Sequence, residues 1–214
     1  MSLKYICSCI KKNSIEDQDY SYWESKDQTS DEKELVKHLY SKDLKKKNIL
    51  HIGIGNSKLA LKFSDDNTIH GITISKKEIS HAKKLNLNNY RLYLIDKYSV
   101  NFRDFLSNID FDYIIDTNLK SYTCCQKSFE YMMENLFKSL KSGGFLVTSR
   151  IGMKWSTILK PKLTFNLKNF FHFKLKEIKS ENKNELSLNE LENICKKNNI
   201  RLLIYDNLCY LEKC

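Results

Sequence analysis

The hydrophobic and polar positions of this chain alternate between two kinds of segment. Short apolar runs, which are typical of buried strands, are separated by stretches with apolar residues every three or four positions, which are typical of amphipathic helices. The apolar runs predict strands at residues 48–52, 68–74, 91–95, 111–116 and 145–149. The stretches between them predict helices at residues 58–63, 76–85 and 129–140, and a short helix or turn at residues 102–106.

Capping residues mark the starts of these helices. Ser75 is placed to cap the helix at residues 76–85, and Glu78 completes the S-x-x-E pattern of a capping box. Asn56 or Ser57 caps the helix that follows the first strand.

Further elements lie at both ends of this alternation. Two more helices are predicted at residues 31–40 and 188–197, with caps at Ser30 and Ser187. The chain closes with strands at residues 200–205 and 208–211, separated by the turn pair Asp206-Asn207. The pair Gly143-Gly144 is expected to end the helix before the fifth strand.

Together these elements predict an α/β fold. Alternating strands and helices favour a doubly wound, mostly parallel seven-stranded sheet in three layers, α/β/α. The two closing strands are too close in sequence for a crossover, so they form an antiparallel hairpin at one edge. No linker divides the chain. We assign residues 1–45 to an N-terminal strap or lid and the first helix, and residues 46–214 to the main domain.

Length and hydropathy indicate a cytoplasmic protein. The 214 residues fit one domain. No stretch approaches the roughly 18 apolar residues of a membrane span. The apolar run at residues 5–10 is too short for a secretory core and lacks a small-residue cleavage site.

The seven cysteines do not form a recognisable framework. Their number is odd and their spacing irregular, which predicts reduced thiols. Cys7-x-Cys9 and Cys124-Cys125 lack a second pair at zinc-site spacing, so no structural metal is expected. A nucleophilic cysteine needs a partnered base and none is evident, so Cys124 and Cys125 are interpreted as buried packing residues.

The net charge of +10 alone would favour a nucleic-acid partner. The charge is almost all lysine, however, and is spread along the whole chain without a compact basic cluster. We therefore do not expect a specific nucleic-acid partner.

The fold predicts where a ligand binds. In an open α/β sheet, ligands bind beyond the carboxyl ends of the strands, at the switch point of the winding. The residues there are 53–57, 73–78, 96–98 and 116–121. Gly53-x-Gly55 allows a tight turn before a helix N-terminus, which presents free N–H groups.

This glycine loop does not match a dinucleotide fingerprint. The pattern G-x-G-x-x-G requires glycine at position 58, which is Lys58. The acid expected about 20 residues beyond the first glycine is replaced by Thr73. A nucleoside-type ligand remains compatible with the loop.

Three segments in order resemble motifs of the class I S-adenosylmethionine-dependent methyltransferases. Residues 49–57 (ILHIGIGNS) resemble the first motif and residues 112–116 (DYIID) the fourth, while residues 140–147 (LKSGGFLV) resemble the turn before the fifth strand. Residues 71–78 (GITISKKE) are similar to a variant in cyclopropane-fatty-acid synthases and some small-molecule methyltransferases.

The resemblance implies a Rossmann-like methyltransferase domain with S-adenosylmethionine as cofactor, acting on a small soluble acceptor. The implied cofactor-binding residues are His51, Gly53, Gly55, Asn56, Ser57, Thr73, Ile74, Ser75, Glu78, Asp96 and Asp116. Glu78 stands where related enzymes carry a cofactor-contacting glutamine. His51 and Thr73 stand where acids are usual, and a protonated His51 would repel the sulfonium.

Fewer residues of the sequence can be assigned to catalysis and to the acceptor pocket. Asp116 is the candidate general base or contact to the cofactor's amino group, and the alternative is a strand-end cap. Asp96 is either an adenine contact or a turn residue. The candidate acceptor-pocket residues are Tyr22, Trp23, Tyr122, Arg150 and Trp155.

Other functions stay open at this point. One is a non-catalytic or partner-dependent binding module on the same fold, which the departures at His51 and Thr73 motivate. Another is an RNA or protein methyltransferase, which draws on the net charge. An aminopropyl transferase is a third, although Asp112 and Asp116 lie at opposite ends of their strand rather than together at its tip.

Overall fold

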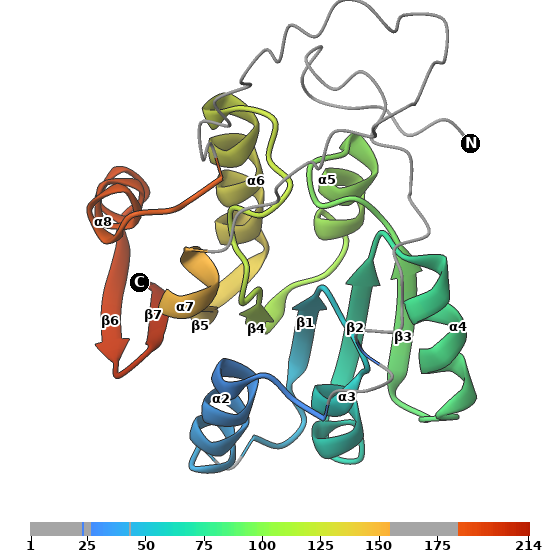
Figure 1. Ribbon diagram of the computed structural model, residues 1–214. Helices are drawn as coiled ribbons and strands as arrows, with labels where there is room; N and C mark the ends of the chain where they lie inside the picture. Colours follow the sequence, from blue (N-terminus) through green and yellow to red (C-terminus); the bar gives the residue numbers. More distant parts are fainter. Residues whose placement is uncertain (1–22, 24–26, 43, 155–183) are drawn as a thin grey trace, which may run out of the picture.

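A seven-stranded sheet forms the centre of the computed structural model, which describes residues 23, 27–42, 44–154 and 184–214 (Figure 1). The strands lie in the order β3-β2-β1-β4-β5-β7-β6. They are β1 (Asn48–Ile52), β2 (Thr68–Thr73), β3 (Tyr90–Leu94), β4 (Phe111–Ile115), β5 (Leu140–Ser149), β6 (Ile200–Tyr205) and β7 (Leu208–Lys213). The helices are α2 (Ser30–Tyr40), α3 (Lys58–Phe63), α4 (Lys76–Lys84), α5 (Val100–Leu106), α6 (Gln126–Ser139), α7 (Arg150–Met153) and α8 (Leu188–Lys197).

The predicted sheet topology is confirmed. β1 to β5 pair in parallel, whereas β7 runs antiparallel to both of its neighbours, β5 and β6. The closing strands therefore form the expected hairpin at one edge. No helix within the described ranges is long and apolar enough to cross a membrane.

Each face of the sheet carries its own hydrophobic core. On β1, Leu50 and Ile52 point to a core shared with α5, α6 and α8, whereas Ile49 points to a core shared with α2 and α3. This alternation along one strand is what a sheet buried on both faces requires. The predicted three layers, α/β/α, are present.

The first described helix belongs to the second of these cores. Leu35, Val36 and Leu39 of α2 are buried in it, and Glu34 accepts hydrogen bonds from the backbone and side chain of Asn207. Thr29, rather than the predicted Ser30, caps α2, because Thr29 forms a reciprocal capping box with Glu32.

The predicted role of the glycine pair before β5 is wrong. α6 ends at Ser139 and the strand already begins at Leu140, so Gly143 and Gly144 lie inside β5. A Cβ on Gly144 would lie 3.1 Å from the carbonyl oxygen of Phe111, so glycine is needed for close packing against β4.

Two further features of the structure were not predicted. α7 is a single turn that the sequence pattern did not predict; its Gly152 approaches Thr117 so closely that a Cβ would lie 1.9 Å from the Thr117 carbonyl oxygen. Cys124 and Cys125 are half-buried, not buried, because they lie at the exposed start of α6.

Candidate functional site

The candidate site lies where β3, β2, β1 and β4 end side by side (Figure 1). Hydrogen bonds continue past the strand ends: Gly53 N donates to Ile72 O (2.8 Å), and Ile95 N donates to Thr73 O (3.0 Å). The winding reverses between β1 and β4, which is the position where open α/β sheets bind ligands. The loops after these strands therefore form the centre of the site.

The loop between β1 and α3 turns through left-handed backbone at Gly53 (φ 76°), Gly55 (φ 49°) and Ser57 (φ 60°). Ser57 is the N-cap of α3, but its hydroxyl makes no capping bond and lies 3.0 Å from the Tyr90 hydroxyl instead. The Asn56 side chain accepts the hydrogen bond from the first N–H of α3 (3.3 Å). Two glycines at positive φ thus leave bare backbone at the helix start.

Glu78 connects this glycine loop to the loop after β2. Its backbone N–H donates to the capping Ser75 hydroxyl (3.3 Å), whereas Ser75 N donates to the Thr73 hydroxyl (3.0 Å) rather than to Glu78. Half of the predicted capping box is therefore present. The Glu78 carboxylate instead accepts from the Thr73 side chain and the Gly55 backbone, and burial raises its pKa.

Glu78 also keeps one acceptor without a partner. Its Oε2 is buried and makes no hydrogen bond among the residues that the structure describes. Such a buried oxygen beside bare backbone is suited to a ligand hydroxyl.

Trp23 packs on the same loop. A Cβ placed on Gly55 would lie 3.1 Å from the indole ring of Trp23. Close by, Asn56 Nδ2 donates to Asp27 O (2.5 Å), and Lys58 Nζ lies 3.5 Å from an Asp27 carboxylate oxygen. The predicted pocket residue Trp23 and the predicted cofactor residues Gly55 and Asn56 are therefore brought together.

His51 is buried near the end of β1, between Gly71 of β2 and Ile115 of β4 in the register. Burial lowers its pKa to about 4, so the imidazole is neutral near pH 7. Its Nδ1 is buried without a hydrogen-bond partner in the described part of the chain. A neutral ring removes the expected repulsion of a cation, but it does not replace a carboxylate.

Asp116 is held by a buried lysine. Lys97 Nζ donates to Asp116 Oδ2 (2.7 Å) and also to the carbonyl oxygens of Asn118 and Leu119 (3.0 Å each). The Ser121 hydroxyl lies 3.3 Å from the same ammonium. Since Lys97 competes for its lone pairs, Asp116 is a poorer general base than its position at the strand tip suggested.

Asp96 fulfils the turn role at the end of β3. Its Oδ1 accepts from Tyr98 N (2.9 Å), and its carbonyl oxygen accepts from the Ser99 hydroxyl (2.7 Å). Burial raises the pKa of Asp96. The carboxylate is buried at the same edge as Glu78 and Asp116.

The predicted acceptor-pocket residues do not all converge. Tyr122 is half-buried in the loop after β4, at φ 61°. Arg150 is exposed beyond β5 and donates to the carbonyl oxygen of Asp206, in the turn between β6 and β7. Tyr22 and Trp155 lie outside the described residues.

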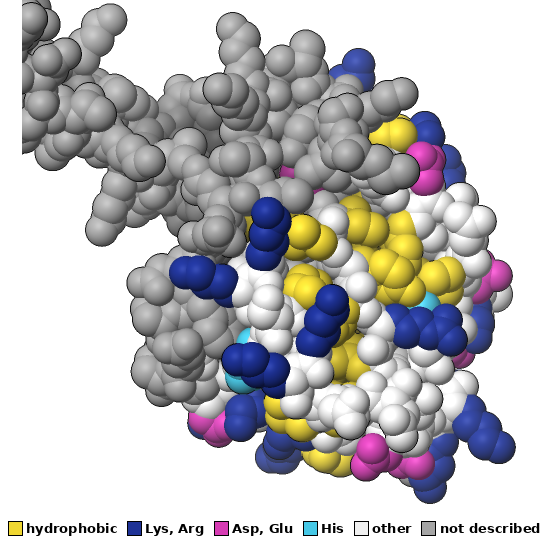
Figure 2. All heavy atoms as spheres, turned by 90° about the vertical axis from the view of Figure 1, so that its right-hand side faces the viewer, with side chains coloured by type: hydrophobic (Ala, Val, Ile, Leu, Met, Phe, Trp, Pro, Cys, Tyr) yellow, Lys and Arg dark blue, Asp and Glu magenta, His cyan; other side chains and the backbone are white. Residues whose placement is uncertain are grey.

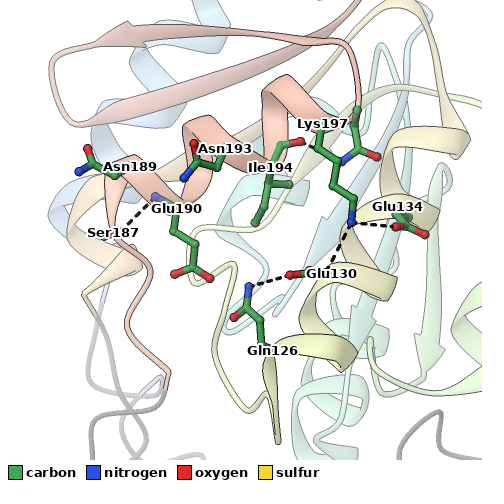
Figure 3. A pocket seen from close by; sticks show the side chains of 10 residues that line it. Gln126, Glu130, Glu134, Ser187, Asn189, Glu190, Asn193, Ile194 and Lys197 are labelled. Carbon is green, nitrogen blue, oxygen red and sulfur yellow. Dashed lines mark hydrogen bonds and ion pairs between the residues drawn. The ribbon is translucent and has the colours of Figure 1, made fainter.

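A separate groove of about 450 Å³ lies between α6 and α8 (Figure 3). Most of its side chains are carboxylates and amides, and Lys197 Nζ lies 3.6 Å from Glu130 and 3.9 Å from Glu134. It is lined by Gln126, Glu130, Glu134, Ser187, Asn189, Glu190, Asn193, Ile194, Lys197 and Asn198. None of the predicted site residues lines it.

The basic side chains do not gather on the face of α4 and β3. Figure 2 shows this face, where lysine and arginine side chains stand apart, with uncharged and hydrophobic side chains between them. A continuous basic stripe, which nucleic-acid binding favours, is not present on the described part of this face.

Sequence reasoning missed Tyr90, and it placed Lys97 at the ligand edge without its contact to Asp116. Tyr90 begins β3 and contacts Ser57 across β2, and Lys97 contacts Asp116, 19 residues further along the chain. Lys97 follows a strand end at the predicted ligand edge, which is the one signal that was available. Its partner depends on how β3 and β4 are placed in the sheet.

Comparisons with known proteins give matches only to solved structures, since no protein-family model and no curated protein matches the sequence. N-methyltransferase NodS from Bradyrhizobium japonicum WM9 aligns with TM-score 0.58 and 13% identity, over 85% of this chain and 96% of its own. A Staphylococcus aureus protein assigned as a caffeoyl-CoA O-methyltransferase aligns with TM-score 0.56 and 18% identity, over 91% and 88%.

A third solved structure resembles this chain in the same way. A TehB-like SAM-dependent methyltransferase from Corynebacterium glutamicum ATCC 13032 aligns with TM-score 0.53 and 12% identity, over 84% of this chain and 86% of its own. The likeness covers most of each chain and lies in the fold.

Proposed function

We propose that this chain, which has the fold of the class I S-adenosylmethionine-dependent methyltransferases, transfers a methyl group from S-adenosylmethionine to a small soluble acceptor. The observation that carries the proposal is Glu78. A buried carboxylate with one oxygen without a described partner lies against a glycine loop at the ligand-binding edge of the sheet.

The described residues fit the nucleoside half of this cofactor. No described atom lies within 4 Å of a Cβ placed on Gly53, so a ligand can approach that backbone. Glu78 Oε2 is the candidate acceptor for a ribose hydroxyl, and Asp96 is the candidate acceptor for the adenine amino group. We assign the cofactor contacts to His51, Gly53, Gly55, Asn56, Ser57, Thr73, Ile74, Ser75, Glu78, Asp96 and Asp116.

The positively charged methionyl half of the cofactor has no unpaired carboxylate among the protein groups assigned to it. His51 is neutral, Thr73 carries no charge, and the Asp116 carboxylate is paired with Lys97. We expect hydrogen bonds rather than full charges to hold the methionyl group, and therefore lower affinity than a carboxylate at position 51 would give. The bound cofactor supplies a methyl group that its sulfonium makes electrophilic.

The protein's own contribution to the reaction is mainly alignment and exclusion of water. Trp23 over Gly55 is the candidate lid residue of the N-terminal segment, residues 1–45, which comprises the strap or lid and the first helix. Tyr122, in the loop after β4, is the candidate wall of the acceptor pocket, to which we also assign Tyr22, Arg150 and Trp155. Asp116 then positions the loop after β4 and does not need to remove a proton.

Calorimetric titration with S-adenosylmethionine and S-adenosylhomocysteine tests the cofactor. Glu78→Leu removes both carboxylate oxygens at a similar side-chain size and is expected to weaken both ligands by about tenfold to a hundredfold, because the acceptor for the ribose hydroxyl is lost. Glu134→Leu in the groove between α6 and α8 is the matched control and should leave both affinities unchanged.

Three results would contradict this assignment. Weakening by Glu134→Leu instead of Glu78→Leu would move the ligand to the groove. An unchanged affinity in both variants would remove Glu78 as the contact. No binding to folded wild-type protein at millimolar ligand would contradict the proposal that the chain is a methyltransferase on its own. It would favour a partner-dependent or non-catalytic module.

The acceptor class is tested separately, with protein that binds the cofactor. Formation of S-adenosylhomocysteine is measured with pools of small amines, alcohols and thiols, and in parallel with RNA and with unfolded protein. Turnover with a small-molecule pool supports the proposal. Turnover with RNA only, with affinity falling steeply as salt rises, would replace it.

A further inference from the structure

Cys124 and Cys125 place two thiols side by side at the start of α6. Cys125 is the N-cap of this 14-residue helix, and Cys124 precedes it. Both side chains are half-buried, and their sulfur atoms lie 3.7 Å apart. The pair is therefore accessible and already close together.

The backbone that carries the pair is fixed on both sides. Fully buried Tyr98 donates its hydroxyl to Ser121 O (2.9 Å), before the pair. The carbonyl oxygen of Cys125 accepts from the Thr123 hydroxyl (3.0 Å) and from Phe129 N (3.2 Å). A ligand that bridges the two sulfurs therefore has little entropy cost to meet for ordering the backbone.

The distance favours a bridging atom over a disulfide. The peptide bond between the two residues is trans, so their Cα atoms lie about 3.8 Å apart, closer than the roughly 4.4–6.8 Å of ordinary disulfides. A metal bound to two thiolates at about 2.3 Å, with a tetrahedral angle between them, holds the sulfurs about 3.8 Å apart. The observed 3.7 Å matches the second geometry.

We propose that Cys124 and Cys125 form a bidentate site for a thiophilic metal or metalloid ion, of the soft class that prefers sulfur ligands. The N-terminus of α6 favours the negative charge of the two bound sulfurs. The described residues contain no group of three or more potential metal ligands. The protein therefore donates two sulfur ligands, and small molecules from solution complete the coordination. This is not a structural zinc site, and metal binding by the two sulfurs does not require methyl transfer.

Phenylarsine oxide is the probe for this site. Its arsenic–oxygen double bond breaks, two arsenic–sulfur bonds form, and the two thiol protons leave with the oxygen as water, so no oxidant or reductant is needed. Full-length reduced protein is treated with one equivalent of the probe in excess glutathione, which competes for single thiols. The adduct is then counted by intact-protein mass spectrometry.

We expect one adduct on the wild-type chain. Cys124→Ser and Cys125→Ser should each weaken it by about 100-fold or more, because the second, tethered sulfur is lost. Cys214→Ser, which removes an exposed single thiol, and the double variant Cys7→Ser/Cys9→Ser should keep the adduct.

Circular dichroism and thermal unfolding show whether each serine variant is folded, and alanine replaces serine where it is not. Absence of the adduct on the wild-type chain overturns the proposal. So does an adduct that both folded Cys124 and Cys125 variants keep. Loss of the adduct in the Cys7/Cys9 variant likewise excludes a two-sulfur site at Cys124 and Cys125.

Discussion

The Nζ atom of Lys97 lies 2.7 Å from Oδ2 of Asp116, and neither side chain is more than one-tenth exposed. This ion pair joins the loop after β3 to the end of β4. Lys97 also donates to the carbonyl oxygens of Asn118 and Leu119, so its hydrogen-bonding groups are engaged. The pair therefore holds the rim of the candidate site and neutralises the carboxylate at its centre.

Removing Lys97 alone should destabilise the fold strongly. Lys97→Met leaves Asp116 buried without a counter-charge, and we expect the free energy of unfolding to fall by about 3–5 kcal/mol. The double variant Lys97→Met/Asp116→Leu removes both charges and should recover most of this loss. Urea unfolding of the three proteins measures the effect. Equal stability of Lys97→Met and wild type would show that the pair is not formed.

The raised pKa of Glu78 predicts a pH dependence of stability. The folded state binds the proton more tightly than the unfolded state, so this carboxyl lowers the free energy of unfolding as pH rises from below 4.5 through the raised pKa. Glu78→Gln does not titrate. Relative to this variant, wild type should lose stability between pH 4 and pH 8. Urea midpoints across that range test it, and a constant difference would contradict it.

Much of the fold followed from local patterns, because each strand or helix carries its own period and cap. The helix at residues 188–197 was predicted with its cap, Ser187, and α8 has those bounds. The strand at residues 48–52 is β1. Gly143-Gly144 was misread because a glycine pair after a helix is also what close packing of β5 on β4 requires.

The site was predictable only where neighbours in sequence remain neighbours in space. Thr73, Ser75 and Glu78 contact one another within one strand–helix turn, as their spacing suggested. The partner of Asp116 was not predictable, since Lys97 reaches it only after β3 and β4 take their places in the sheet. Long-range pairs of this kind leave no periodic signal in a single sequence.

His51 predicts a loss of stability in acid. Burial lowers its folded pKa to about 4 from 6.5, so its contribution is complete above pH 6.5 and is lost as pH falls towards 4. The loss amounts to about 3 kcal/mol. His51→Asn should remove this part of the pH dependence. His70, whose pKa is also lowered to about 4, needs the matched variant His70→Asn, because both groups act in the same range. Urea unfolding at pH 5 and pH 7.5 separates the contributions of the two histidines. If the free energy of unfolding of His51→Asn falls between these pH values as much as that of wild type, the ring of His51 is solvated.

Gly71 is expected to be the least replaceable position beneath the glycine loop. A Cβ there would lie 2.6 Å from the ring of Tyr90 and 2.9 Å from the Ile54 side chain, so Gly71→Ala must displace Tyr90. We expect a loss of about 1–3 kcal/mol from overpacking. The displacement also breaks the contact between the Tyr90 and Ser57 hydroxyls, so cofactor affinity should fall with stability.

Two variants separate overpacking at Gly71 from backbone strain. Gly71→Ala/Tyr90→Leu opens space for the new methyl group and should regain stability without restoring the hydroxyl contact to Ser57. Gly53→Ala has open space around its Cβ but a φ of 76°, so its cost of about 1 kcal/mol comes from the backbone alone. Urea unfolding measures stability and calorimetric titration measures S-adenosylmethionine affinity. If Tyr90→Leu does not rescue Gly71→Ala, the clash with Tyr90 is not the cause, and Ile54 is the contact that limits this position.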